Sequence, residues 1–236
     1  MNAVAKPKAA ASVILLRPAE PQGFEVLLTR RRNETPSLGE RYCFPGGSVH
    51  ESDHADGMLR RCRGLSTGGA RKIIGAHLPP RQALGFWVAA ARVLFEKAGL
   101  LLAVKESGEP IAVEAEADAG LRAKRAALVE QRLGFHSILE SENLFCDAAT
   151  IRYFSHWRAE SPDSGDTRIF LAAMPEGQPP PAAAIEGARW LAPDRALQLF
   201  NRGELTIAFP TFVSLGTLAD FDDVKSALRA YQLERS

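Results

Sequence analysis

Ala91-Arg-Val-Leu-Phe-Glu-Lys-Ala-Gly-Leu-Leu101 is the stretch that decides the fold, together with the earlier loop Tyr42-Cys-Phe-Pro-Gly-Gly-Ser-Val-His50. Alanine and leucine favour a helix in the later stretch, and Gly99 is the residue type that commonly ends one. Positions 93, 96 and 97 are related as i, i+3 and i+4, so their side chains emerge on one face of that helix. The double glycine of the loop lets its backbone come close to an ion or a phosphate.

The two stretches together resemble the Nudix box. In that box, a glycine and a glutamate of a loop precede a helix of the pattern Arg-Glu-U-x-Glu-Glu-x-Gly-U, where U is bulky and apolar, and three helix glutamates hold magnesium against a diphosphate. The matching positions are Gly47, Arg92, Leu94, Glu96, Gly99 and Leu100, with Asp53 in place of the loop glutamate. Val93 and Lys97 replace two of the three helix glutamates, so the box is degenerate.

These two replacements predict weak metal binding. Magnesium prefers hard oxygen ligands in near-octahedral order, and each lost carboxylate removes a ligand and a compensating negative charge. A lysine ammonium has no lone pair with which to coordinate a cation. We therefore expect Mg²⁺ or Mn²⁺ to be held weakly if the protein is active.

The resemblance extends over most of residues 10 to 215. The order of its elements is similar to that of the long-insertion branch of Nudix hydrolases, which includes peroxisomal coenzyme A diphosphatases and bacterial relatives. These elements are an apolar strand, the glycine loop, a long insertion, the helix and two late strands. The resemblance implies an α/β/α sandwich around a mixed β-sheet. It also implies an insertion inside the box, at about residues 54 to 82, and a C-terminal helix at about 220 to 232. We expect a single domain over residues 8 to 236.

Hydrophobic patterns and turn residues predict the individual elements. Strands are expected at residues 10–16, 24–29, 150–157, 167–174 and 187–191, and helices at 81–104, 112–133, 193–200 and 220–231. The pair Pro79-Pro80 stops any helix before the first of these, and Gly99 marks its end. The insertion is rich in glycine and basic residues, and we expect it to be partly helical or mobile.

Composition narrows the class of protein. The chain has 236 residues, of which 46% are hydrophobic, so it can bury a substantial core. A formal net charge of +1 gives no general attraction to nucleic acid or to a membrane. The apolar run at residues 9–16 is too short for a signal peptide or a membrane span. Cys43, Cys62 and Cys146 lack metal-ligand spacing and leave an odd thiol, which favours a reducing, cytoplasmic location.

Two glutamates are candidates for catalysis. Glu96 matches a family metal ligand, but a helix-surface glutamate paired with Arg92 at i, i+4 is the simpler interpretation. Glu186 precedes Trp190, at a place where several Nudix proteins carry a metal ligand or a general base on a late loop. An ordinary surface glutamate is an equal alternative for this residue.

The glycine loop contributes the other candidate metal ligands. Asp53 stands at the position of the family's loop glutamate, and a backbone carbonyl of Gly47 can add an oxygen ligand. Glu51 lies in the same loop, although loop carboxylates are more often solvated. Arg92 and Gly99 match box positions whose role is structural.

Cationic side chains are the candidates for binding a phosphorylated substrate. Lys97 either points to solvent or places its ammonium against a phosphate, where a metal ion would otherwise sit. The other residues of the predicted substrate site are Arg30, Arg31, Arg41, Gly46 and Gly47, with more basic side chains in the insertion. Surface clusters of arginine without a ligand are common, so both interpretations stay open. Nucleic acid is disfavoured because no series of aromatic residues accompanies the charge.

Two functions fit these residues. The first is a Nudix hydrolase of a nucleoside diphosphate linked to another moiety, coenzyme A-like or nucleotide-like, with weakened magnesium dependence or activity. The second is a catalytically inactive Nudix domain that binds a phosphorylated ligand or a protein partner. We expect a small phosphorylated ligand of the nucleotide or coenzyme A type and no membrane partner, and the sequence leaves a homodimer open.

Overall fold

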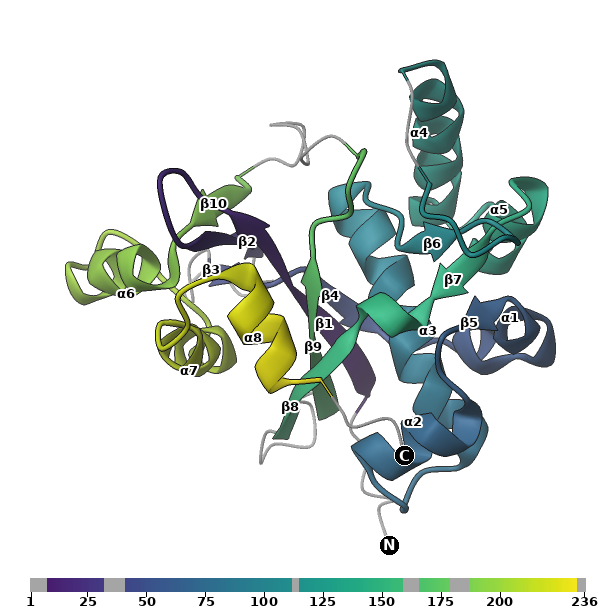
Figure 1. Cartoon of the computed structure of the whole chain (residues 1–236), viewed down its shortest axis with the longest axis horizontal. Helices are drawn as coiled ribbons and strands as arrows, with labels where there is room; N and C mark the ends of the chain where they lie inside the picture. Colours follow the sequence, from purple (N-terminus) through teal and green to yellow (C-terminus); the bar gives the residue numbers. More distant parts are fainter. Residues whose placement is uncertain (1–7, 32–40, 112–114, 159–165, 179–186, 233–236) are drawn as a thin grey trace, which may run out of the picture.

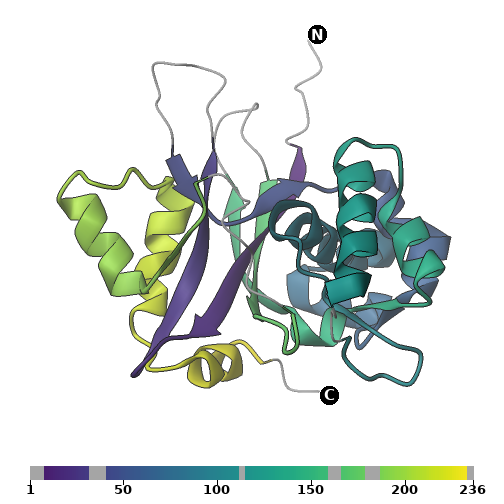
Figure 2. The same cartoon turned by 90° about the horizontal axis from the view of Figure 1, so that it is seen from above.

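The computed structural model describes residues 8–31, 41–111, 115–158, 166–178 and 187–232. Within these residues the strands form one sheet of seven strands and one of three. Helices lie on both sides of the larger sheet, as Figure 1 and the view from above in Figure 2 show. The arrangement confirms the mixed α/β fold, with a mixed sheet between helices, that the sequence predicts.

The larger sheet is centred on its first strand. Its main path runs β10 (Arg189–Leu191), β2 (Phe24–Arg31), β1 (Ala9–Pro18), β9 (Asp166–Ala173) and β8 (Arg152–Arg158), while β3 (Arg41–Cys43) pairs with β2 and β4 (Gly46–Ser48) with β1. Strand β1 is parallel to β9 and antiparallel to β2 and β4. The first and last thirds of the chain are therefore joined side by side at the centre of the sheet.

Strand β1 contributes side chains to two separate cores. Val13 and Leu15 belong to the core on the side of the long helix, and Ile14 and Leu16 belong to the core on the opposite face. Successive side chains of a strand point to opposite faces of its sheet. A continuous apolar run such as this one is typical of a strand that is covered on both faces.

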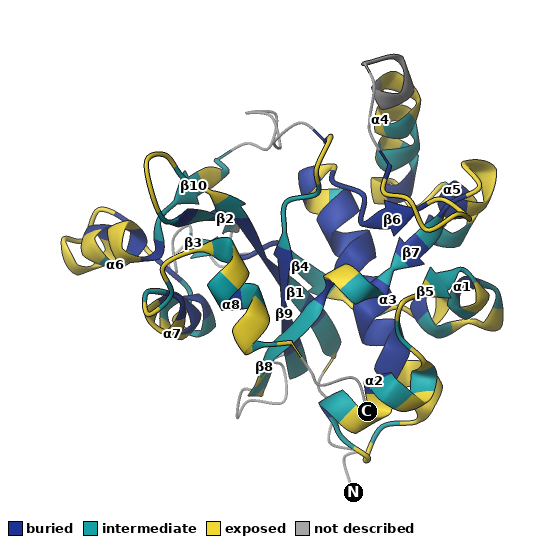
Figure 3. Ribbon diagram, in the orientation of Figure 1, coloured by how far each residue is buried: buried dark blue, intermediate teal, exposed yellow. Residues whose placement is uncertain are grey.

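Helix α3 (Pro80–Ala98) packs against β1 and is buried along most of its length, as its dark blue colour in Figure 3 shows. The predicted range extends too far, to residue 104, whereas the helix ends at Gly99 as that residue type predicts. Gly99 adopts a left-handed conformation with φ of 72°, and its N–H donates to the carbonyl oxygen of Phe95 at 2.9 Å. Glycine takes this conformation without steric cost and so ends the helix. Ala103 and Val104 form strand β6 (Ala103–Val104) instead.

The insertion is folded into short elements beside α3. They are helix α1 (Asp56–Arg60), strand β5 (Cys62–Arg63) and helix α2 (Thr67–Ile74), and the 3-10 helix η2 (Glu51–His54) leads into them. The N–H of Gly69 donates to the side-chain oxygen of Ser66, which caps the start of α2. Helix α2 packs on α3. The expected helical content of the insertion is confirmed.

A smaller sheet joins the insertion to the middle of the chain. Strand β5 pairs in parallel with β7 (Phe145–Asp147), and β7 pairs antiparallel with β6. Helices α4 (Ala115–Val129) and α5 (Phe135–Ser141) lie near this sheet (Figure 1). Sequence patterns did not predict the sheet, because strands of two or three residues have no measurable periodicity.

The remaining elements are the 3-10 helix η3 (Ala148–Thr150), α6 (Pro193–Asn201), α7 (Phe209–Leu218) and α8 (Val224–Ala230). Helices α6 and α8 correspond to predicted helices, with shifted boundaries. The strand expected from residue 150 begins at Arg152, because η3 precedes it. The C-terminal helix is shorter than expected, since Asp223 accepts a hydrogen bond from the N–H of Ser226 and caps its start. Helix α7 was not predicted. None of the described helices has both the length and the apolar character needed to cross a bilayer.

Candidate functional site

The glycine loop lies against one face of α3. Strand β4 carries Gly46 and Gly47 and pairs with β1 through the registers Ser12 with Gly46 and Ala11 with Gly47. Helix α3 contacts both β4 and η2. The fold therefore brings together the loop and the helix that the sequence identifies as the two halves of the box.

Val93 fills the space between the two halves. The side chain is fully buried, and a Cβ atom added to Gly47 would lie 3.0 Å from Cγ2 of Val93. A residue larger than glycine would require Val93 or the loop to shift by a few tenths of an ångström. The position that carries a glutamate in the family pattern thus presents methyl groups to the loop in this chain.

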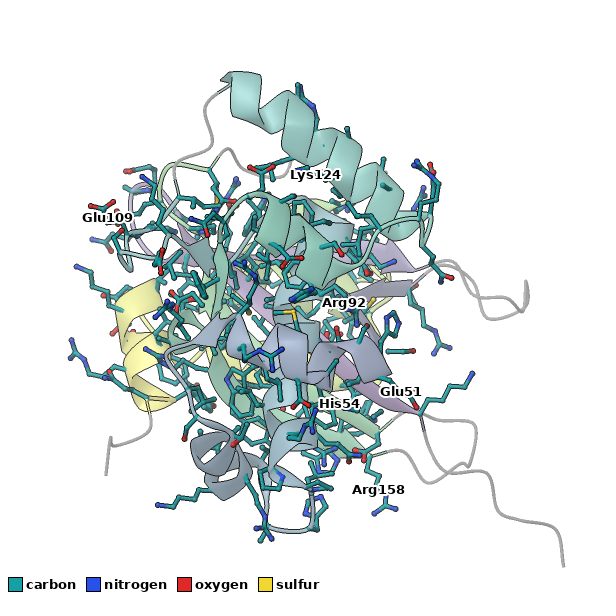
Figure 4. All side chains as sticks on the ribbon, turned by 90° about the vertical axis from the view of Figure 1, so that its right-hand side faces the viewer. Glu51, His54, Arg92, Glu109, Lys124 and Arg158 are labelled. Carbon is teal, nitrogen blue, oxygen red and sulfur yellow. The ribbon has the colours of Figure 1, made fainter. Side chains whose placement is uncertain are left out.

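Arg92, which is labelled in Figure 4, links the loop to the helix. Its Nε donates to Oδ1 of Asp53 at 2.7 Å, and its Nη2 donates to Oδ2 of Asp53 at 2.8 Å and to the carbonyl oxygen of Ser48 at 2.7 Å. Its Nη1 donates to Oε1 of Glu96 at 2.8 Å. Burial alone would lower the pKa of Arg92, but the hydrogen bonds and charges of Asp53 and Glu96 outweigh it, and the pKa is raised. Arg92 is therefore a buried, permanently charged bridge.

Asp53 is held in place by this bridge. Only 1% of the residue is exposed, and both carboxylate oxygens accept hydrogen bonds from Arg92. Oδ2 also accepts the N–H of His50 at 2.8 Å, which holds the start of η2. This geometry favours a structural role for Asp53, and its role as a metal ligand stays a prediction.

Glu96 and Lys97 face different surroundings on α3. Glu96 is half-buried and pairs with Arg92 through Oε1, while within the described residues its Oε2 has no hydrogen-bond partner. Lys97 is exposed to solvent. Of the three positions on this helix face, only Glu96 therefore offers a carboxylate oxygen.

The predicted substrate-binding arginines lie on the neighbouring strands. Arg30 on β2 is half-buried against Gly187, where an added Cβ would lie 2.7 Å from Nε of Arg30. Arg41 is half-buried on β3 and is paired in register with Arg31 of β2. The side chain of Arg31 lies outside the described residues, and so does Glu186. Glu51 is exposed at the start of η2.

Two residues that bind the backbone at or just after the end of α3 were not identified from the sequence. Arg125 of α4 donates from Nε to the carbonyl oxygen of Glu96 at 2.9 Å and from Nη2 to that of Lys97 at 3.3 Å, and burial lowers its pKa. Gln178 is buried and exchanges two hydrogen bonds with the backbone of Leu101, at 2.8 and 3.0 Å. The bonds of Arg125 join α4 to the end of α3, and those of Gln178 join the segment after β9 to the residues that follow α3. Both sets are contacts distant in sequence that no local pattern could have indicated.

Within the described part of the chain, the site offers too few free carboxylate oxygens to hold a divalent ion tightly. Magnesium requires several oxygen ligands, whereas Arg92 occupies both oxygens of Asp53 and one of Glu96. Across the residues that the structure describes, no group of three or more His, Cys, Asp or Glu side chains lies close enough to hold a metal ion.

Comparisons with known proteins agree with the fold. A crystal structure of a Nudix hydrolase from Alicyclobacillus acidocaldarius superposes with a TM-score of 0.69 at 23% sequence identity, over 93% of this chain and 94% of that one. The fold is thus that of a Nudix hydrolase. The acyl-coenzyme A diphosphatase NUDT19 of Gallus gallus is 26% identical over 88% of this chain and 64% of its own length.

The sequence similarity and the shared fold together support membership of the Nudix superfamily. The chain spans less than two thirds of the length of its chicken relative. No family model matches the sequence. The similarity concerns the fold and the sequence as a whole, and it leaves the substrate of this chain to be proposed.

Proposed function

We propose that this protein is a Nudix-type diphosphatase that hydrolyses a nucleoside diphosphate linked to another moiety, coenzyme A-like or nucleotide-like, with a weak dependence on divalent metal. The similarity to an acyl-coenzyme A diphosphatase supports the substrate class. A cytoplasmic location is part of the proposal, supported by three cysteines that are all free thiols.

The observation that carries the proposal is the assembled box. The glycine loop, the Arg92 bridge and Glu96 come together although two family glutamates are replaced. Oε2 of Glu96 is the oxygen through which the site could contact a weakly held ion. Glu186 and the carbonyl of Gly47 are proposed to assist, with Arg30, Arg31, Arg41 and Gly46 binding the phosphates.

A second candidate, a catalytically inactive domain that binds a phosphorylated ligand, is favoured by one specific observation. The aliphatic side chain of Val93 is fully buried against Gly47, on the helix face where the family pattern has a metal-binding glutamate. In such a protein the basic residues near the box would bind the phosphates directly, without an intervening cation.

A ligand panel separates the two candidates. Thermal unfolding is measured with coenzyme A, acyl-coenzyme A, nucleotides and dinucleotides, with magnesium or with a chelator. The same mixtures are assayed for the released nucleotide, which is adenosine 3′,5′-bisphosphate from coenzyme A and a nucleoside monophosphate from a dinucleotide. Metal-dependent stabilisation together with product supports the diphosphatase, because a ligand stabilises the state that it binds. Stabilisation that the chelator leaves unchanged, without product, supports the binding domain. If no phosphorylated compound changes the melting temperature and no product forms, both candidates are wrong.

A further inference from the structure

Cys62 and Cys146 are direct neighbours on adjacent strands of the smaller sheet. Strands β5 and β7 pair in parallel with Cys62 opposite Cys146, and the N–H of Cys146 donates to the carbonyl oxygen of Arg61 at 2.8 Å. Paired strands lie about 4.8 Å apart, within the range of about 4.4 to 6.8 Å between Cα atoms that a disulfide spans. The backbone thus holds the two cysteines at a distance suitable for cross-linking.

The two thiols project from the same face of this sheet. Arg61 and Arg63, on either side of Cys62, place their guanidinium groups over the ring of Phe145, at 5.3 and 4.0 Å from its centroid. Because side chains alternate along a strand, the side chains of Cys62 and Cys146 occupy the opposite face. Cys146 is fully buried in the core that includes α3, and Cys62 packs against that core while staying partly exposed. The thiol of Cys62 can therefore react with a reagent from solvent, and the buried thiol of Cys146 lies beneath it.

The surroundings give the two thiols different chemistry. The contact with Cys62, followed by burial and by the charges of Asp147 and Asp53, raises the pKa of Cys146 well above its usual value. A thiolate, and not a thiol, is the reactive nucleophile. This contact and the burial therefore favour the neutral thiol of Cys146.

We propose that Cys62 and Cys146 form a peroxide-sensitive dithiol site, in which a reversible disulfide joins the insertion to β7. In the first step the sulfur of Cys62 attacks hydrogen peroxide, which yields a sulfenic acid and one molecule of water. In the second step the sulfur of Cys146 attacks the sulfur of Cys62, so that the sulfur–sulfur bond forms and a second water leaves. The two thiols lose two hydrogens in total, and a small thiol reductant restores them.

The bond would have a structural consequence for the box. The closed loop runs from residue 62 to residue 146 and contains all of α3, including Arg92 and Glu96. Strand β5 has only two residues, so few ladder bonds otherwise tie the insertion to β7. Cross-linking restricts the unfolded chain and stabilises the fold more for long loops than for short ones. Formation of this disulfide does not depend on catalysis, so it is tested separately from the proposed function.

Peptide mapping of the full chain tests the site. The reduced protein is treated with hydrogen peroxide, alkylated and digested with trypsin. We expect a new linked species that joins the dipeptide Cys62-Arg63 to the peptide from Leu133 to Arg152, and its loss on treatment with reductant. Cys43→Ser is the matched control and retains the linked species, whereas Cys62→Ser and Cys146→Ser abolish it. Oxidation raises the melting temperature of the wild type and of Cys43→Ser by on the order of 5 °C.

Several results would overturn the proposal. One is that peroxide leaves both cysteines as free thiols, or converts Cys62 to sulfinic or sulfonic acid without any linked peptide. Another is a linked species that forms only between two chains, which a mixture of isotopically labelled and unlabelled protein reveals. Because the peptide map is made on the wild type, it does not depend on whether the serine variants fold.

Discussion

Arg92 has three partners, and each fixes a different part of the box. Asp53 holds the start of η2, the carbonyl of Ser48 holds the glycine loop, and Glu96 lies one turn further along α3. Asp53 and Arg92 are both almost fully buried, so neither charge is compensated by water. Taking one partner away from a buried ion pair costs more than the pair itself contributes, because a charge is left without compensation.

Arg92→Met should therefore destabilise the protein by about 3–5 kcal/mol. Asp53→Leu should cost a similar amount, and the double variant should cost less than the sum of the two, because no lone charge then stays buried. Urea denaturation of the four proteins gives the coupling free energy. Strictly additive losses would mean that the pair does not hold loop and helix together. Lys97→Met removes an exposed charge from the same helix and serves as the control with little effect.

Val93→Glu combined with Lys97→Glu restores the two family glutamates beside Glu96. We expect the double variant to gain magnesium-dependent stabilisation, since three carboxylates on one helix face can share an ion. The measurement is the change in melting temperature on adding magnesium, together with hydrolysis of the same ligand panel. Lys97→Glu alone is the control, because Val93 still fills the space against Gly47 in that variant. A double variant that folds but ignores magnesium would show that more than the lost glutamates weakens the site.

At the scale of elements, α3 and β1 could be predicted because each carries its own signals. Pro79 and Pro80 stand at the start of α3 and Gly99 at its end, and the apolar run of β1 marks a strand buried on both faces. The two halves of the box could be located for the same reason, since the residues within each half are close in sequence. Local propensity and periodicity are sufficient where an element is long and has clear ends.

Elements that depend on distant contacts could not be predicted. Helix α7 contains a valine, a glycine and two threonines, all poor helix formers, and it packs against α6. The hydrogen bonds of Gln178 to Leu101 and the pairing of β5 with β7 join residues far apart in the chain. The partners of Asp53 belong to this group as well. The sequence identified Asp53 as a site residue, but its hydrogen bonds to Arg92 are visible only in the folded structure.

Gly99→Ala should destabilise the protein by about 1–2 kcal/mol, because an alanine in the left-handed region is strained. The nearest side-chain atom to an added Cβ is 3.7 Å away, at Cδ of Arg125, so a clash adds nothing to this cost. Gly120 is the matched control, since it is exposed within α4 and an added Cβ meets nothing within 4 Å. Gly120→Ala should stabilise the protein by about 0.5–1 kcal/mol. Denaturation midpoints that shift in the same direction for both variants would contradict this account of the helix end.

For the molecule as a whole, the two cores have one strand in common. Leu15 packs on the side of α3 and the insertion, and Leu16 on the side of α6, α7 and α8, yet both lie in β1. Loss of packing on either side therefore disturbs the strand on which the other side depends. We expect the two helical layers to unfold together as one domain.

Leu15→Ala and Leu16→Ala test this expectation from opposite faces. Both leucines are fully buried, and each truncation should cost about 2–5 kcal/mol by leaving a cavity. Calorimetry should show a single transition in each variant, shifted to lower temperature by similar amounts, because β1 transmits the loss to both cores. A thermogram with two transitions, of which Leu15→Ala moves one and Leu16→Ala the other, would mean that the layer with α3 and the insertion folds as a unit of its own.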